Sequence, residues 1–117
     1  MSYLLLVIEK PGDRAARTET EARALYERML RFSEDLTRRG ALVMAQSLKS
    51  ESTAVRVTNE EGRLVVRDGP FAEAKELVGG FFLLTCETLD EATRIARECP
   101  AMHWATIEVR ELGPCFS

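Results

Sequence analysis

The chain has 117 residues, of which 45% are hydrophobic and 30% are charged, and its formal net charge is -3. We therefore predict one globular domain over residues 1–117, long enough to bury its own core. Because positive charge is not in excess, direct nucleic-acid binding is not favoured. The longest apolar run near the start, residues 3–8, is too short for a membrane span or a signal peptide. A cytoplasmic protein without a membrane partner is the resulting prediction.

The three cysteines do not indicate a redox or metal framework. Cys86, Cys99 and Cys115 are odd in number and lack a Cys-x-x-Cys spacing, so neither a disulfide set nor a zinc site is predicted. Cys86 and Cys99 are expected to be small core residues. The sequence also lacks a glycine-rich phosphate loop, a histidine-rich cluster and a serine or cysteine nucleophile motif. We therefore predict no cofactor and no metal.

The first elements are a buried strand and a long helix. Residues 3–8 are apolar on both faces, which favours a central strand. A helix is predicted from Thr18 or Thr20, because Thr18 and Glu21 have the spacing of a capping box, and Gly40 is placed to end it. Its apolar stripe recurs every three or four residues, as expected of a helix face: Ala22, Leu25, Met29, Phe32 and Leu36.

The middle of the chain is predicted to be β-structure. Residues 41–48 form a second strand, and residues 54–58 and 63–66 form a hairpin around a four-residue turn, 59–62. The second hairpin strand leads into Asp68. A further apolar strand is predicted at residues 80–86, with the glycines before it ending any helical turn.

A second helix and a last strand complete the pattern. Thr88 and Glu91 have capping-box spacing, and Pro100 ends the helix. The predicted buried face consists of Leu89, Ala92, Ile95, Ala96 and Cys99. The last strand, residues 104–110, alternates polar and apolar side chains, so that one of its faces is polar.

Without the hairpin, this order is β-α-β-β-α-β. The predicted fold class is therefore α+β, ferredoxin-like with an inserted β-hairpin, with both helices on one face of the sheet. The other face would then be too apolar to remain in water. Pairing of two such sheets in a homodimer is the expected remedy.

The stretch Asp68-Gly69-Pro70-Phe71 is the first candidate for a site. Pro70 fixes its own φ and restricts Gly69, which gives a rigid bend that presents the Asp68 carboxylate beside the ring of Phe71. Ligand-binding sites are often built on such loops. The structural alternative is that Asp68 caps an Asx-type turn and Phe71 simply enters the core.

Several stretches carry a resemblance to a known family: Asp68-Gly69-Pro70-Phe71-Ala72-Glu73, Lys75-Glu76, Gly79-Gly80-Phe81, Leu89-Asp90-Glu91-Ala92, Cys99-Pro100 and Ile107-Glu108-Val109-Arg110. With these stretches in this order, nearly the whole chain resembles the YCII-related family, specifically its DGPF-domain branch. The resemblance implies a dimeric α/β barrel. In that family a conserved histidine and aspartate suggest an enzyme, and fusions to sigma-factor domains suggest a role in transcription.

The family's aspartate corresponds to Asp68, whereas its histidine has no counterpart in residues 26–32. The only histidine is His103, before the last strand, and its ring is either a proton-transfer group or an ordinary surface or packing residue. Arg67 and Lys75 are either ligand-binding cations or members of surface ion pairs. Gly69, Pro70 and Phe71 would form the rest of a binding site.

The function predicted from the sequence is that of a small cytoplasmic homodimer. It binds a small polar molecule near Asp68, and its chemistry, if it is an enzyme, is proton transfer with Asp68 as the catalytic group. The alternative is a non-catalytic regulatory or interaction module linked to transcription, as the family's fusions suggest.

Overall fold

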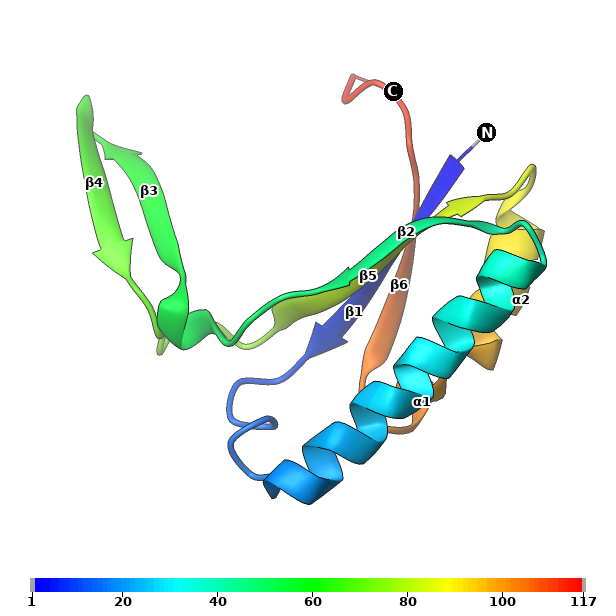
Figure 1. The fold of residues 1–117 in the computed structure, drawn as a ribbon. Helices are drawn as coiled ribbons and strands as arrows, with labels where there is room; N and C mark the ends of the chain where they lie inside the picture. Colours follow the sequence, from blue (N-terminus) through cyan, green and yellow to red (C-terminus); the bar gives the residue numbers. More distant parts are fainter. Residues whose placement is uncertain (1, 117) are drawn as a thin grey trace.

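The structure is a computed structural model of the chain, and it describes residues 2–116. Its elements follow one another along the chain as shown in Figure 1: β1 (Ser2–Glu9), α1 (Glu19–Arg38), β2 (Leu42–Ser47), η1 (Glu51–Thr53), β3 (Val55–Glu60), β4 (Arg63–Asp68), β5 (Leu77–Thr85), α2 (Leu89–Glu98), η2 (Pro100–His103) and β6 (Thr106–Glu111).

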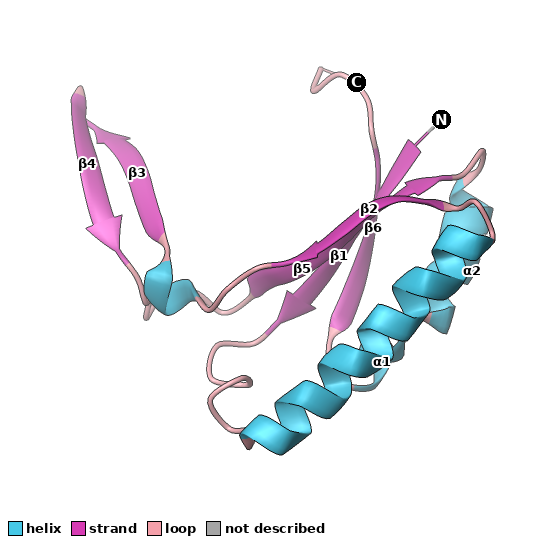
Figure 2. Cartoon of the chain, viewed as in Figure 1, coloured by secondary structure: helices cyan, strands magenta, loops and turns pink. Residues whose placement is uncertain are grey.

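Four of the strands form an antiparallel sheet in the order β2-β5-β1-β6. Both helices lie on one face of this sheet, and no helix covers the other face (Figure 2). The apolar first strand is central, as its two apolar faces predict. The α+β, ferredoxin-like fold class is confirmed. Neither helix of the described chain is long and apolar enough to cross a membrane.

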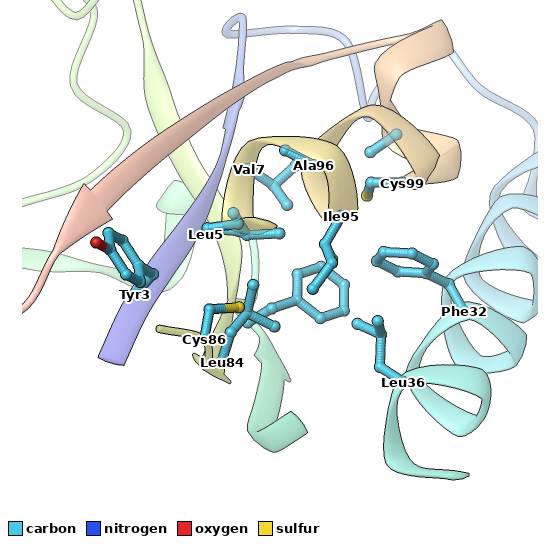
Figure 3. Close-up of a cluster of buried hydrophobic side chains, with 13 residues drawn as sticks. Tyr3, Leu5, Val7, Phe32, Leu36, Leu84, Cys86, Ile95, Ala96 and Cys99 are labelled. Atoms are coloured by element: carbon cyan, nitrogen blue, oxygen red, sulfur yellow. The ribbon is translucent and has the colours of Figure 1, made fainter. Parts of the chain in front are cut away.

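The core lies between the sheet and the helices (Figure 3). Alternate residues of β1 point into it, and Phe32 of α1 packs edge-on against Phe82 of β5, with ring centroids 5.4 Å apart. Cys86 and Cys99 are buried there, which confirms their predicted packing role. Burial raises the pKa of both thiols, so they stay protonated and unreactive near neutral pH.

The predicted ends of α1 are confirmed. The Thr18 hydroxyl accepts from the Glu21 N–H, and the Glu21 carboxylate accepts from the Thr18 N–H. The hydrogen bonds from the Thr18 backbone and hydroxyl lower the pKa of Glu21. Gly40 follows the helix with a φ of 72°, and the Ala41 N–H donates to the Leu36 carbonyl at 2.9 Å. This is a Schellman-type end, which favours glycine.

The start of α2 differs in detail from the prediction. Thr88 caps the helix as expected, but the Glu91 carboxylate accepts from the Glu87 N–H and not from Thr88. Leu89 is 56% exposed and lies outside the buried face, which consists of Ala92, Ile95 and Ala96 with Cys99 just beyond. Leu89 lies in the first turn of the helix, and more than half of it is exposed to solvent.

Strand β5 begins three residues earlier than predicted and includes both glycines of the pair Gly79-Gly80. Gly80 pairs with Val7 and Val78 pairs with Ile8, so Gly79 is the extra residue of a β-bulge. Glycine in a strand often marks a bulge or a close approach of other groups. The pair therefore shapes the strand and does not precede it.

Strands β3 and β4 form a separate two-stranded sheet, residues 55–68, which we call the arm. Its turn has two residues and not four, because Glu61 and Gly62 have φ values of 53° and 86°, as a tight hairpin turn requires. The arm extends away from the helical layer (Figure 1). The radius of gyration is accordingly 16.0 Å, whereas a compact domain of this length has about 13 Å.

Candidate functional site

A pocket of about 500 Å³ opens between the first half of α1 and the sheet. This volume lies within the usual range of small-molecule sites. Its walls come from the end of β1, the loop before α1, one side of α1, β2, the start of β5 and Trp104. The residues that matter below are Arg14, Arg17, Leu25, Met29, Gly80, Phe82 and Trp104.

The pocket forms because only the second half of α1 packs closely against the sheet. In the apolar stripe of α1, Phe32 and Leu36 are buried in the core, whereas Leu25 and Met29 are only partly buried and face the pocket. Opposite them the sheet presents the small residues Ala45 and Gly80. Because no large side chain fills this space, the first half of the stripe lines a cavity and does not continue the core.

The loop before α1 is held against β5 by Arg14. Its guanidinium pairs with Glu9 at 2.7 Å and donates to the carbonyls of Leu48 and Gly79 at 2.6 and 3.0 Å. A Cβ atom on Gly79 would lie 2.6 Å from the Glu9 carboxylate. The bulge glycine therefore leaves room for the ion pair, which forms one end of the pocket.

Arg17 is the cation with the least committed side chain in the pocket. The residue is half-buried, and its guanidinium makes no hydrogen bond or ion pair with any residue from 2 to 116. The Thr18 hydrogen bonds are the main cause of the lowered pKa of Glu21, and the positive charge of Arg17 lowers it further. Arg23, by contrast, pairs with Glu19 at 2.9 Å. A partly buried guanidinium without a carboxylate partner is suited to bind an anion.

The surface of the pocket is otherwise largely apolar, and its two carboxylates, Glu9 and Glu19, pair with Arg14 and Arg23. Trp104 is half-buried, and the Arg28 guanidinium lies 5.2 Å from its ring centroid. Met29 and Phe82 add further apolar surface. A pocket with an apolar body and one available cation fits a small organic anion whose hydrocarbon part is desolvated on binding.

Asp68 lies elsewhere, at the end of β4 on the exposed arm. Its side chain makes no hydrogen bond or ion pair within the described part of the chain, so the Asx-type turn does not form. Glu51 holds the bend instead, since its carboxylate accepts from the Phe71 N–H at 3.2 Å, and the Gly69 N–H donates to the Ala54 carbonyl at 2.8 Å.

Gly69 is required for close approach and not for an unusual backbone angle. Its φ is not positive, but a Cβ atom there would collide with the Glu51 carbonyl oxygen. Phe71 is buried, and the Arg56 guanidinium lies 4.0 Å from its ring centroid. The motif thus fastens the base of the arm to η1.

The remaining predicted site residues are dispersed. Arg67 pairs with Glu60 at 2.9 Å on the arm, Lys75 is exposed and forms no ion pair within residues 2–116, and His103 is exposed in η2. The structure keeps residues 67–71 together at the base of the arm and brings none of the predicted site residues into the pocket of its own chain. Their roles in binding or catalysis stay predictions.

Since the Asp68 carboxylate makes no hydrogen bond or ion pair with residues 2–116, neither Asp68→Asn nor Asp68→Ala should change the free energy of unfolding by more than about 0.5 kcal/mol. Urea denaturation of both variants checks this. If Asp68→Ala alone lowered the free energy of unfolding and Asp68→Asn did not, Asp68 would have the turn-capping role after all, because the amide can still accept the local hydrogen bond.

Sequence reasoning missed the pocket, although two signals point to it. Arg14, Arg17 and Arg23 surround the start of the amphipathic helix, and a glycine pair interrupts an otherwise bulky strand. Neither signal identifies a cavity until the helix is placed over the glycines. Among residues 2–116, no group of three or more histidine, cysteine, aspartate or glutamate side chains could hold a metal ion.

Comparison with known proteins agrees with this architecture. The model of the YCII-related domain matches residues 1–115, so the chain belongs to the YCII-related family. An uncharacterised protein of Rhizobium meliloti (strain 1021) is 30% identical over 115 residues, covering 97% of this chain and 93% of the relative. The assignment to the DGPF-domain branch is compatible with both findings and stays a prediction.

A solved structure has a similar fold. It is 5-chloro-2-hydroxyhydroquinone dehydrochlorinase (TftG) from Burkholderia phenoliruptrix AC1100, in complex with 2,5-dihydroxybenzoquinone. The two chains superpose with a TM-score of 0.57 at 16% identity, over 97% of this chain and 94% of the other. At this identity the likeness concerns the fold alone.

Proposed function

We propose that this protein binds a small organic anion in the pocket between α1 and the sheet. The observation that carries the proposal is Arg17, a half-buried guanidinium without a hydrogen-bonded partner among the described residues, at the wall of an otherwise largely apolar cavity. The dehydrochlorinase with a similar fold is in complex with a small ring compound. A ring bearing an acidic oxygen would use both features of the pocket.

We propose further that the protein acts as a homodimer. On the face of the sheet opposite the helices, the strand register brings together a set of apolar side chains, which we call the open sheet face: Leu4, Leu6, Ile8, Met44, Phe81 and Leu83. The edge strand β6 adds Thr106, Glu108 and Arg110 beside it. An apolar centre with a polar edge resembles a subunit interface, and a stable one buries about 1,600 Å² in total.

Asp68 remains our proposal for a proton-transfer group, in case the protein is an enzyme. Its carboxylate is exposed and not committed to the fold, as a group that exchanges protons with a ligand requires. The non-catalytic alternative, a regulatory module, would use the same pocket to sense its ligand. Both an enzyme and a regulatory module would have to bind a small molecule in the pocket, so ligand binding is the first property to test.

The only tryptophan of the chain lines the pocket, so its fluorescence reports binding directly. Titration with benzoate should change Trp104 emission, whereas benzamide, which has the same shape without the charge, should bind more weakly. Arg17→Gln should lower benzoate affinity by about ten- to a hundredfold, since a charged hydrogen bond contributes about 1.5 to 3 kcal/mol. Its affinity for benzamide should change little.

Arg31→Gln is the matched control, because Arg31 lies on the same helix but pairs with Glu27 in solvent and does not line the pocket. Its benzoate affinity should equal that of the parent. Equal binding of benzoate and benzamide by the parent would contradict the role of Arg17. An emission spectrum that neither compound changes would contradict the proposed binding site.

A further inference from the structure

The arm has two chemically different faces. The strand register places Val55, Val57 and Asn59 opposite Asp68, Val66 and Leu64, so these six side chains share one face. The other face carries the Arg67–Glu60 pair and Arg56 above Phe71. The first face, which we call the apolar arm face, therefore has Val57 and Val66 at its centre. Its corners are two aliphatic side chains, Val55 and Leu64, and two polar ones, Asn59 and Asp68.

This face has no partner within the described part of the chain. Val55, Val57, Leu64 and Val66 are 58%, 61%, 77% and 64% exposed. Together they expose on the order of 400 Å², which equals the largest apolar patch of many monomers. Strands β3 and β4 pack mainly on each other, and an isolated two-stranded hairpin is at best marginally stable in water. The arm needs something to cover it.

We infer that the apolar arm face is a contact surface for a second copy of this chain. The inference rests on the homodimer that we propose above. It adds a second contact surface, which is separate from the open sheet face. Area favours the second copy, because the arm face alone supplies about half of the 800 Å² per partner that a standard interface buries. In a symmetric dimer both arm faces are buried at once, in addition to the sheet contact.

The shape of the chain agrees with this occupant. In the view of Figure 1 the arm stands on the side of the sheet opposite the helices. The arm continues from β2 and leads into β5, the two strands at one side of the sheet. A copy packed on the open sheet face would therefore lie beside the arm of its partner.

The polar corners also fit an interface. The Asn59 side-chain oxygen accepts from the Gly62 N–H at 2.8 Å, and the Asp68 carboxylate lies at the base of the arm. Apolar centres with polar rims are typical of subunit contacts. The same packing would place a partner next to Asp68, which has no enclosing neighbours in its own chain.

The test compares Val57→Lys with Thr58→Lys in the full chain. Both variants add one positive charge at adjacent positions of β3, but Val57 is on the apolar arm face and Thr58 is on the opposite face. Light scattering over a dilution series measures the dimer dissociation constant of each. We expect Val57→Lys to raise it at least about tenfold, because the lysine charge would lose its water at the centre of the contact, and Thr58→Lys to leave it within about twofold.

Equal dissociation constants for the two variants would overturn the inference about the arm while leaving a homodimer through the open sheet face. A monomeric parent would overturn the arm contact and the homodimer together, whereas benzoate binding at Trp104 is measured independently of both. Circular dichroism shows whether each variant is folded. As a second measurement, amide hydrogen exchange of β3 and β4 in the parent should slow as protein concentration rises, and no such dependence would also overturn the inference.

Discussion

Phe32→Ala should lower the free energy of unfolding by about 3 to 5 kcal/mol, the usual cost of removing a buried phenylalanine. Phe32 is 7% exposed, and its ring contacts Phe82 edge-on, so it joins α1 to the centre of the sheet. It also lies one helical turn beyond Met29, where the core gives way to the pocket. The truncation would extend the cavity into the core and remove the contact that holds the helix at this distance.

Urea denaturation measures this effect, and Arg31→Ala is the control. The Arg31 side chain is exposed and pairs with Glu27 only at 3.8 Å, so its loss should change the free energy of unfolding by no more than about 0.5 kcal/mol. Comparable losses in the two variants would mean that the helix does not present Phe32 to the sheet.

Gly69→Ala should lower the free energy of unfolding by about 1 to 3 kcal/mol and loosen the base of the arm. The new methyl group would collide with the backbone carbonyl of Glu51, and backbone cannot move aside as a side chain can. The hydrogen bonds that Gly69 and Phe71 make with the segment around η1 would be strained with it. Thermal denaturation, combined with limited proteolysis of residues 55–68, measures both consequences.

Gly79→Ala provides the comparison. The atoms nearest to its added Cβ would be side-chain atoms of Glu9 and Arg14, which can move more easily than backbone. We therefore expect a smaller loss of stability than in Gly69→Ala, and no increase in proteolysis of the arm. If the two alanine variants were equally stable, the tight contact between Gly69 and Glu51 would not be a constraint on the fold.

Local signals in the sequence predicted most of the fold correctly. The pairing of Thr18 with Glu21 and the left-handed Gly40 are decided within a few residues, so they can be identified without tertiary information. The central position of β1 follows from its two apolar faces. The exposed position of Leu89 could not be predicted, because it depends on how far the sheet extends beneath the helix.

The candidate site was less predictable because it depends on relative placement. The sequence predicts that Gly79 and Gly80 end a helical turn. The bulge at Gly79 and the close approach of Glu9 and Arg14 become apparent only in the folded structure. The structure gives Gly69 and Phe71 a role in fastening the arm, and the binding site predicted around Asp68 stays a prediction. Arg17 has no local signature of its own, since only the folded structure shows that no carboxylate of the described residues forms an ion pair with it.

A crystal structure of the protein grown with benzoate tests the central claim most directly. The account predicts the benzoate ring against Met29 and Trp104, with its carboxylate about 3 Å from the Arg17 guanidinium. Benzoate bound at the base of the arm beside Asp68, with the pocket between α1 and the sheet containing only water, would contradict it.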